Sequence, residues 1–308
     1  MNWHSQEIDE LVRRALAEDV GSGDATTAAI VPAGTPAKAT ILARQTLMCA
    51  GLRIAESVFR ALDPEMHVRY LHHDGSFVEA GAKLIELTGE ARAILTGERT
   101  ALNFLAHLCG IATHTKRFVE KLAGTHARIR DTRKTTPGLR ALEKYAVKCG
   151  GGTNHRFGLY DAVLIKENHI AIAGGVKAAL DRAHAFTSLK MAAPRAASAY
   201  DAVDLHPEVA GPGALSVQIE VRYEGELREA LDAGAEAVLL DNMTPDVARR
   251  CVQLARSLRR DCVLEISGGI TLDNVRAYAE TGADFLSSGA LTHSAPSADL
   301  SLLVESAR

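Results

Sequence analysis

Four short apolar runs, regularly spaced in the last third of the chain, constrain the fold more than any other feature of the sequence. They begin at residues 217, 237, 263 and 285, and each is followed by a longer segment with helical periodicity. This spacing is long enough for one strand, one turn and one helix per repeat, as the connections of a parallel sheet require. Similar runs occur at 128–130 and 162–165. We therefore predict a parallel α/β domain over residues 118–294.

The residues that follow these runs favour a barrel over an open, doubly wound sheet. No G-x-G-x-x-G motif follows an early strand, and a polar residue stands at the end of each run. Barrel enzymes collect their catalytic groups at the carboxyl ends of their strands. We therefore expect an open or irregular parallel α/β barrel whose rim carries Lys166, Glu220, Asp241, Ser267 and Ser288.

The first third of the chain has a different pattern, which predicts an α+β domain at residues 1–117. Apolar residues at 8, 11, 12 and 16 indicate an amphipathic helix that ends before the glycines at 21 and 23. Short strand-like runs at 39–43, 67–71 and 83–87 alternate with helical patterns at 53–62 and 99–122. The C-terminal tail, 295–308, is expected to join this domain. Residues 187–213 interrupt the βα rhythm and are interpreted as an insertion.

Composition excludes several classes of partner. The chain has 308 residues, 47% of them hydrophobic, and a formal net charge of -3, so no overall positive field attracts nucleic acid or an anionic membrane. No apolar stretch reaches the ~20 residues of a membrane span. The five cysteines are widely separated and contain no C-x-x-C pair, which argues against disulfides and zinc. A cytoplasmic protein is expected, and any anion site must be local.

A local basic cluster occurs between residues 128 and 156. Arg133 and Lys134 precede a turn with two threonines, a proline and a glycine, and His155 and Arg156 follow three successive glycines. Backbone amides in such turns favour anions. Three other basic residues, spaced i, i+4 and i+8, are interpreted as a solvated helix face outside the site: Arg140, Lys144 and Lys148.

Two longer stretches contain this cluster, and a third follows it: Asp131-Thr-Arg-Lys-Thr-Thr-Pro-Gly, Lys148-Cys-Gly-Gly-Gly-Thr-Asn-His-Arg and Asp161-Ala-Val-Leu-Ile-Lys-Glu-Asn-His. Together they resemble the quinolinate phosphoribosyltransferase family. The resemblance extends from Leu16 to His293, which is almost the whole chain. It implies an enzyme of NAD biosynthesis that transfers phosphoribosyl from phosphoribosyl pyrophosphate to quinolinate. The products would be nicotinate mononucleotide, pyrophosphate and CO2.

The resemblance also implies roles for individual residues. Those that match the family's quinolinate binders are Arg99, Arg133, His155 and Arg156, with Arg99 reaching the active site of the neighbouring subunit of a homodimer, which could assemble further. Lys134, Lys166, Glu220 and Asp241 match catalytic residues around phosphoribosyl pyrophosphate. Glu220 and Asp241 would also help bind Mg²⁺, directly or through water or substrate. The residues that match the 5'-phosphate loops are Ser267, Gly268, Gly269, Ser288 and Gly289.

Two other functions are compatible with the same scaffold. One is a paralogue with another acceptor, such as nicotinate, or the molybdenum-transport-associated relative of the family. The other is a catalytically silent barrel that binds a phosphorylated metabolite. The chain also departs from the family in two places. Arg222 stands where an acidic residue is common, and an insertion precedes the predicted strand that carries Glu220. Both departures affect the expected position of Glu220.

Overall fold

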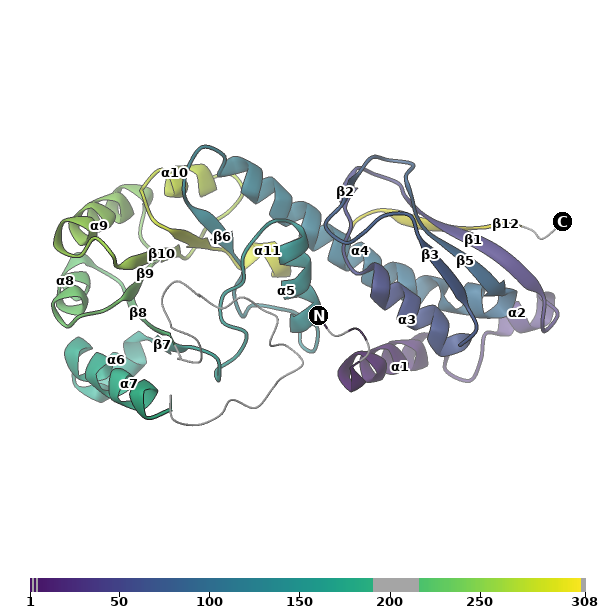
Figure 1. The fold of residues 1–308 in the computed structure, drawn as a ribbon, viewed down its shortest axis with the longest axis horizontal. Helices are drawn as coiled ribbons and strands as arrows, with labels where there is room; N and C mark the ends of the chain where they lie inside the picture. The colour runs from purple at the N-terminus through teal and green to yellow at the C-terminus, as the bar shows by residue number, and fades with distance from the viewer. Residues whose placement is uncertain (2, 4, 191–215, 306–308) are drawn as a thin grey trace. The chain divides into compact units, whose positions relative to one another are not determined.

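The computed structural model describes residues 1, 3, 5–190 and 216–305. The chain divides into two compact units, and Figure 1 shows the order of their elements along the chain. Unit 1 comprises Met1–Lys116, Ala141–Gly151 and Ala295–Arg308, and unit 2 comprises Arg117–Arg140 and Gly152–Ser294. Most of the insertion expected at 187–213 lies outside the described residues, and only 187–190, at the end of a helix, fall within them.

Unit 1 is an α+β structure, as predicted. Its elements are α1 (Gln6–Val20), α2 (Ala25–Ile30), β1 (Pro36–Ala43), β2 (Leu47–Met48), α3 (Leu52–Leu62), β3 (His67–Tyr70), β4 (Phe77–Val78), β5 (Lys83–Glu90), most of α4 (Ala91–Lys121), most of α5 (Arg140–Cys149) and β12 (Leu300–Glu305). The main sheet is antiparallel in the order β12-β1-β5-β3. The last strand of the chain thus pairs with the first. Helix α1 buries Ile8, Val12 and Leu16, which are three of the four apolar positions that predicted it.

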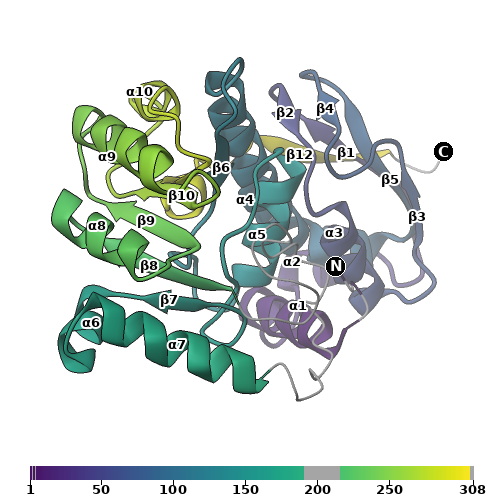
Figure 2. The same ribbon diagram turned by 60° about the vertical axis from the view of Figure 1, so that its left-hand side comes forward.

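Unit 2 contains the predicted parallel sheet. Its elements are β6 (Arg128–Arg130), β7 (Val163–Ile165), α6 (Glu167–Ala173), α7 (Val176–Lys190), β8 (Val217–Val221), α8 (Glu224–Asp232), β9 (Ala237–Asp241), α9 (Pro245–Leu258), β10 (Val263–Ser267), α10 (Val275–Ala279), β11 (Phe285–Ser287) and α11 (Ala290–His293). The four strands that anchored the prediction begin at 217, 237, 263 and 285, as expected. Figure 2 shows α8 and α9 side by side along the sheet.

The strand order in unit 2 is β6-β11-β10-β9-β8-β7, and every pair is parallel. Strands β6 and β7 are the two ends of the sheet, so within the described residues the sheet is open, as the prediction of an open or irregular barrel allowed. A single bridge between Arg130 and Thr153 extends the sheet beyond β6. Because parallel strands point the same way, the residues after each strand gather at one edge of the sheet.

One prediction about helix α5 is wrong. Arg140, Lys144 and Lys148 do not form a solvated face: Lys144 is fully buried and Arg140 is half-buried, whereas Lys148 is exposed. The reason is packing within unit 1, where His107 of α4 lies 2.8 Å from the buried Glu143 of α5. Helical spacing alone does not tell which side of a helix its neighbours cover.

Candidate active site

A cavity of about 300 Å³ opens at the carboxyl edge of the unit 2 sheet. Eight of the predicted site residues line it: Arg133, Lys134, His155, Arg156, Lys166, Glu220, Asp241 and Ser267. They come from loops or strand ends after β6, β7, β8, β9 and β10, and from the segment near residue 153 that lies beside β6. The parallel sheet therefore brings together side chains that are more than 130 residues apart in the sequence.

Two arginines give the cavity its most distinctive chemistry. Arg156 is only 7% exposed, and its Nη1 donates to the carbonyl of Ala162 over 3.2 Å. Among the residues that the structure describes, the Nε atoms of Arg133 and Arg156 are buried and have no hydrogen-bond partner. Burial, and then the neighbouring charge of Arg133, lower the pKa of Arg156 below its ordinary value. Two neighbouring guanidinium groups with buried, unused Nε donors are suited to bind an anion between them.

A second part of the cavity combines lysines with carboxylates. Lys166 Nζ donates to Glu220 Oε2 over 3.0 Å, and the Lys166 side chain remains half exposed. Burial and the charge of Glu220 raise the pKa of Asp241, while Lys166 and Lys134 oppose this effect. These four groups are therefore close enough to influence one another, although they come from four different loops and strands.

Arg222, the departure from the family pattern, takes part in ion pairs at the same edge. Its Nη1 lies 2.7 Å from Glu167 Oε2, and its Nη2 lies 2.8 Å from Glu226 Oε1. It thereby links the start of α6 to the start of α8. Glu220 lies on β8, two residues before Arg222, and borders the cavity, so it reaches the rim although Arg222 stands where an acid is common.

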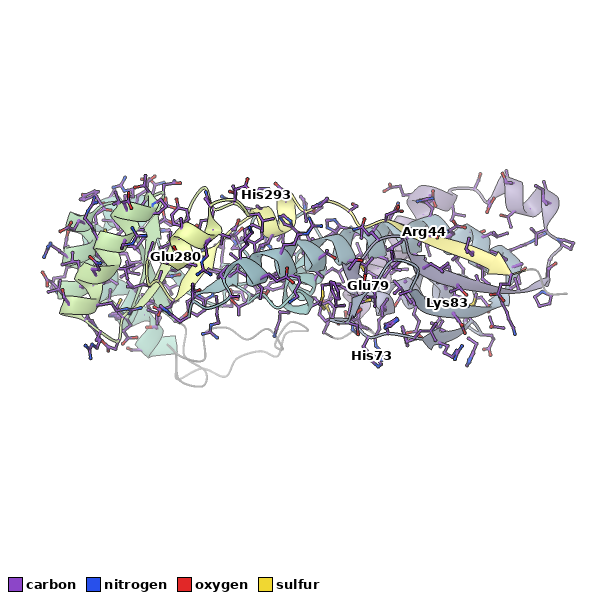
Figure 3. All side chains as sticks on the ribbon, turned by 90° about the horizontal axis from the view of Figure 1, so that it is seen from above. Arg44, His73, Glu79, Lys83, Glu280 and His293 are labelled. Carbon is purple, nitrogen blue, oxygen red and sulfur yellow. The ribbon has the colours of Figure 1, made fainter. Side chains whose placement is uncertain are left out.

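The two glycine loops lie at the ends of β10 and β11. Gly268 and Gly269 have positive φ angles of 100° and 64°. Gly289 lies close to two side chains, because a Cβ at this position would be 2.9 Å from His293 Cδ2 and 3.0 Å from Lys134 Cδ. Figure 3 labels His293, the last residue of α11. Gly289 thus allows the backbone of its loop to approach Lys134.

Ser288 holds these loops in place through its own polar groups. Its hydroxyl donates to the carbonyl of Ile270 over 2.7 Å, and its amide donates to the carbonyl of Arg130 over 3.0 Å.

Arg99, the remaining predicted site residue, lies exposed on α4 in unit 1.

Several residues around the cavity were not predicted from the sequence. Thr132, Leu164, Leu239, Glu265 and Ser287 also line it. Glu265 is fully buried, although it belongs to a strand whose neighbouring residues are apolar. An acidic residue inside such a run is a signal that could have identified it, because charged side chains are rarely buried without partners.

A second cavity, of about 400 Å³, lies between α1 and α3 in unit 1. Its arginines are already paired with acids: Arg13 with Glu10, and Arg53 and Arg60 with Glu56. This cavity therefore lacks the unused donors that distinguish the one in unit 2.

Three further features of the described residues concern metal ligands, cysteines and membrane helices. Among the described residues, no group of three or more His, Cys, Asp or Glu side chains is arranged to hold a metal ion. All five cysteines are free thiols. Within the described part of the chain, no helix is both long and apolar enough to cross a membrane.

Comparisons with known proteins identify the family to which the chain is related. The family models for quinolinate phosphoribosyl transferase match residues 24–109 with the N-terminal domain, and 111–194 and 194–303 with the C-terminal domain. A nicotinate-nucleotide pyrophosphorylase [carboxylating] of Mycobacterium leprae is 41% identical and covers 95% of each chain. A probable enzyme of the same name from Bacillus subtilis is 38% identical over 96% of this chain and 93% of its own.

Solved structures give the same result. The nicotinate-nucleotide pyrophosphorylase from Francisella tularensis superposes with a TM-score of 0.85 at 38% identity, covering 97% of this chain and 96% of its own. The resemblance inferred from the sequence motifs is confirmed. The chain belongs to the quinolinate phosphoribosyltransferase family.

Proposed function

We propose that the cavity of unit 2 is the site at which the chain transfers phosphoribosyl from phosphoribosyl pyrophosphate to quinolinate. The chain forms nicotinate mononucleotide, pyrophosphate and CO2 in NAD biosynthesis, as its family does. The observation that supports this location is the pair of buried Nε donors of Arg133 and Arg156, which have no protein partner among the described residues. Quinolinate has two adjacent carboxylates, and a guanidinium group binds a carboxylate through two parallel hydrogen bonds.

The two ends of the cavity match the two substrates. Arg133, His155 and Arg156 bind the quinolinate carboxylates at one end. Lys134 and Lys166 lie beside Glu220 and Asp241 at the other, where their charges stabilise the departing pyrophosphate. The two acids then face the ribose and stabilise the positive charge that develops at its C1 atom.

The reaction requires positioning more than proton transfer. The pyridine nitrogen forms a bond to C1 of the ribose while the C1–O bond breaks, and pyrophosphate leaves with that electron pair. The ring nitrogen becomes positive, so its charge stabilises the electron pair that stays on C2 when the bond from C2 to its carboxylate breaks and CO2 leaves. A proton then replaces CO2 at C2. The arginines keep the nitrogen and C1 in reacting geometry, which accounts for much of the rate enhancement in such reactions.

Mg²⁺ is proposed as the cofactor. Glu220 and Asp241 offer hard oxygen ligands on adjacent strands, and Mg²⁺ is commonly held by one or two carboxylates together with water and substrate phosphates. Bound Mg²⁺ would neutralise charge on the pyrophosphate. Two carboxylates leave coordination positions for water and substrate phosphates, as Mg²⁺ requires. The described residues provide no group of three or more His, Cys, Asp or Glu side chains that could hold the ion alone.

The 5'-phosphate is proposed to bind the glycine loops at 267–269 and 288–289. Gly268→Ala tests this placement, because the added Cβ would lie 2.3 Å from Asn242 Oδ1 and 2.9 Å from Asn242 Cα. We expect KM for phosphoribosyl pyrophosphate to rise about 10-fold or more, equivalent to about 1.4 kcal/mol. Gly174→Ala is the matched control: its φ is also positive and nothing lies within 4 Å of its Cβ, but it follows α6 outside the cavity lining. Equal effects of the two substitutions on this KM would contradict the placement.

We also propose that the enzyme is a cytoplasmic homodimer in which Arg99 of each subunit contributes to the neighbouring site. An exposed arginine on α4, within unit 1, is available for such a role. The free thiols of all five cysteines suit a reducing compartment.

One assay tests the proposed function. Purified protein is incubated with quinolinate, phosphoribosyl pyrophosphate and Mg²⁺, and nicotinate mononucleotide and CO2 are measured. We expect both products in equal amounts and none after chelation of the metal. A parallel reaction with nicotinate distinguishes an acceptor with one carboxylate. Faster turnover of nicotinate than of quinolinate, or formation of neither product, would refute the proposal.

A further inference from the structure

A fully buried carboxylate at the edge of the cavity has no part in the proposal above. Glu265 lies on β10 and is 0% exposed. Its Oε2 atom accepts hydrogen bonds from Arg130 Nη1 over 3.2 Å and from Gln218 Nε2 over 3.0 Å. Its Oε1 atom accepts a short hydrogen bond from the Ser287 hydroxyl and lies 3.5 Å from His155 Nε2. Four separate segments therefore meet at one side chain.

This arrangement keeps Glu265 ionised. Burial would raise the pKa of Glu265, but the positive charge of Arg130 and the hydrogen bonds from Gln218 and Ser287 lower it below its ordinary value. A buried charge is costly even when paired, and apolar residues of similar volume often stabilise a core as well or better. Packing alone is thus a weak reason to place a carboxylate here.

Only one of the four partners is among the proposed substrate-binding residues. His155 Nδ1 accepts a hydrogen bond from the amide of Arg156 over 2.8 Å. A neutral imidazole with this contact carries its proton on Nε2, the atom that faces Glu265. The His155 amide donates to Asp131 Oδ1 over 2.8 Å, which fixes the backbone as well. The ring therefore has a neighbour at each of its two nitrogens, and the backbone that carries it is held at the amide.

We propose that Glu265 is a positioning residue for the dicarboxylate substrate and that it acts through His155. By fixing the Nε2 side of the imidazole, Glu265 keeps Nδ1 directed at the Arg156 amide and so holds these two adjacent binding residues in one arrangement. The inference rests on the proposed function, since it assigns Glu265 to the quinolinate end of the cavity. Glu265 itself touches no reacting atom in this account.

The alternative is that Glu265 only neutralises Arg130. Arg130 is 3% exposed, and its guanidinium lies 3.1 Å from the centre of the Phe285 ring. A purely structural pair of this kind would affect folding and both substrates alike. Its effect would also not depend on whether residue 155 carries an imidazole.

A double-mutant cycle separates the two accounts. Glu265→Gln is made in the wild-type protein and in His155→Ala, and kcat and KM are measured for both substrates. We expect Glu265→Gln to lower kcat/KM for quinolinate about 10-fold or more in the wild-type background, but less than about twofold in His155→Ala. KM for phosphoribosyl pyrophosphate should change less than about twofold in each. Equal losses in both backgrounds would overturn the proposal.

Additional variants address folding. If Glu265→Gln leaves Arg130 with an uncompensated charge and fails to fold, the cycle is run with Arg130→Gln/Glu265→Gln, which removes both charges. Asp284→Asn is the control. Asp284 also pairs with an arginine of unit 2, since its Oδ2 lies 2.7 Å from Arg256 Nη2, but neither residue lines the cavity. It should leave kcat/KM for quinolinate within about twofold of wild type.

A binding measurement distinguishes failure of this inference from failure of the proposed function. Calorimetric titration with benzene-1,2-dicarboxylate, which has the same pair of adjacent carboxylates, is repeated across the cycle. If the wild-type protein forms no nicotinate mononucleotide but the dicarboxylate binds with the same dependence on His155, the proposed reaction fails and the role of Glu265 stands. If the product forms but neither kcat/KM nor binding shows coupling between the two residues, the inference about Glu265 is wrong. Failure of the wild-type protein to bind the dicarboxylate at all would overturn both.

Discussion

Replacing Arg156 with lysine is expected to lower kcat/KM for quinolinate about 100-fold, equivalent to about 2.7 kcal/mol. Lysine keeps the positive charge but loses the planar fork that binds a carboxylate through two hydrogen bonds. The loss should be large because Arg156 is 7% exposed and its Nε has no protein partner among the described residues. Steady-state kinetics with quinolinate as the varied substrate measures it.

The matched control for this prediction is Arg222→Lys. Arg222 lies at the same edge of the sheet, but it is not part of the cavity lining and is already paired with Glu167 and Glu226. This substitution also keeps the charge, and kcat/KM for quinolinate should stay within about twofold of wild type. Similar losses from both substitutions would mean that the general positive potential, rather than a specific fork, binds the substrate. If KM for phosphoribosyl pyrophosphate rises as much as KM for quinolinate, Arg156 does not bind quinolinate specifically.

The parallel sheet could be predicted because its signal is local and repeated. Each strand of unit 2 is a short apolar run, and the starts of β8, β9, β10 and β11 could be read directly from the sequence. The residues at the rim followed from the same reasoning, since a parallel sheet places all its carboxyl ends together. This is why Lys166, Glu220 and Asp241, which are far apart in sequence, could be assigned to one site before their geometry was known.

Features that depend on packing between distant segments could not be predicted in this way. The spacing of Arg140, Lys144 and Lys148 indicated a common helix face, but only the packing of α5 in unit 1 determines that Lys144 is buried. Glu265 was overlooked for a related reason. Its partners come from β6, β8, β11 and the segment around residue 155, and the sequence gives no sign that these four meet at one carboxylate.

The largest loss of activity is expected for Lys166→Ala and for Arg99→Ala, each of which should lower kcat about 1000-fold or more. Lys166 forms the ion pair with Glu220 at the proposed pyrophosphate end of the cavity. Arg99 is proposed to complete the site of the neighbouring subunit. The two substitutions should therefore complement each other in a mixed dimer, because one of its two sites would contain an intact Lys166 from one subunit and an intact Arg99 from its partner.

Coexpression of the two variants with different affinity tags, followed by purification on both tags, isolates the mixed dimer. In a twofold-symmetric dimer one complete site out of two should restore about half of the wild-type activity. Lys166→Ala paired with Arg133→Ala is the control: both residues line the cavity of the same unit, so each site of that mixed dimer lacks one of them and no activity should return. If the Arg99 mixture stays as inactive as this control, Arg99 does not act across subunits. If Arg99→Ala alone keeps near wild-type activity, it has no role in either site. Recovery in the first mixture and not in the second would therefore require a site built from two chains.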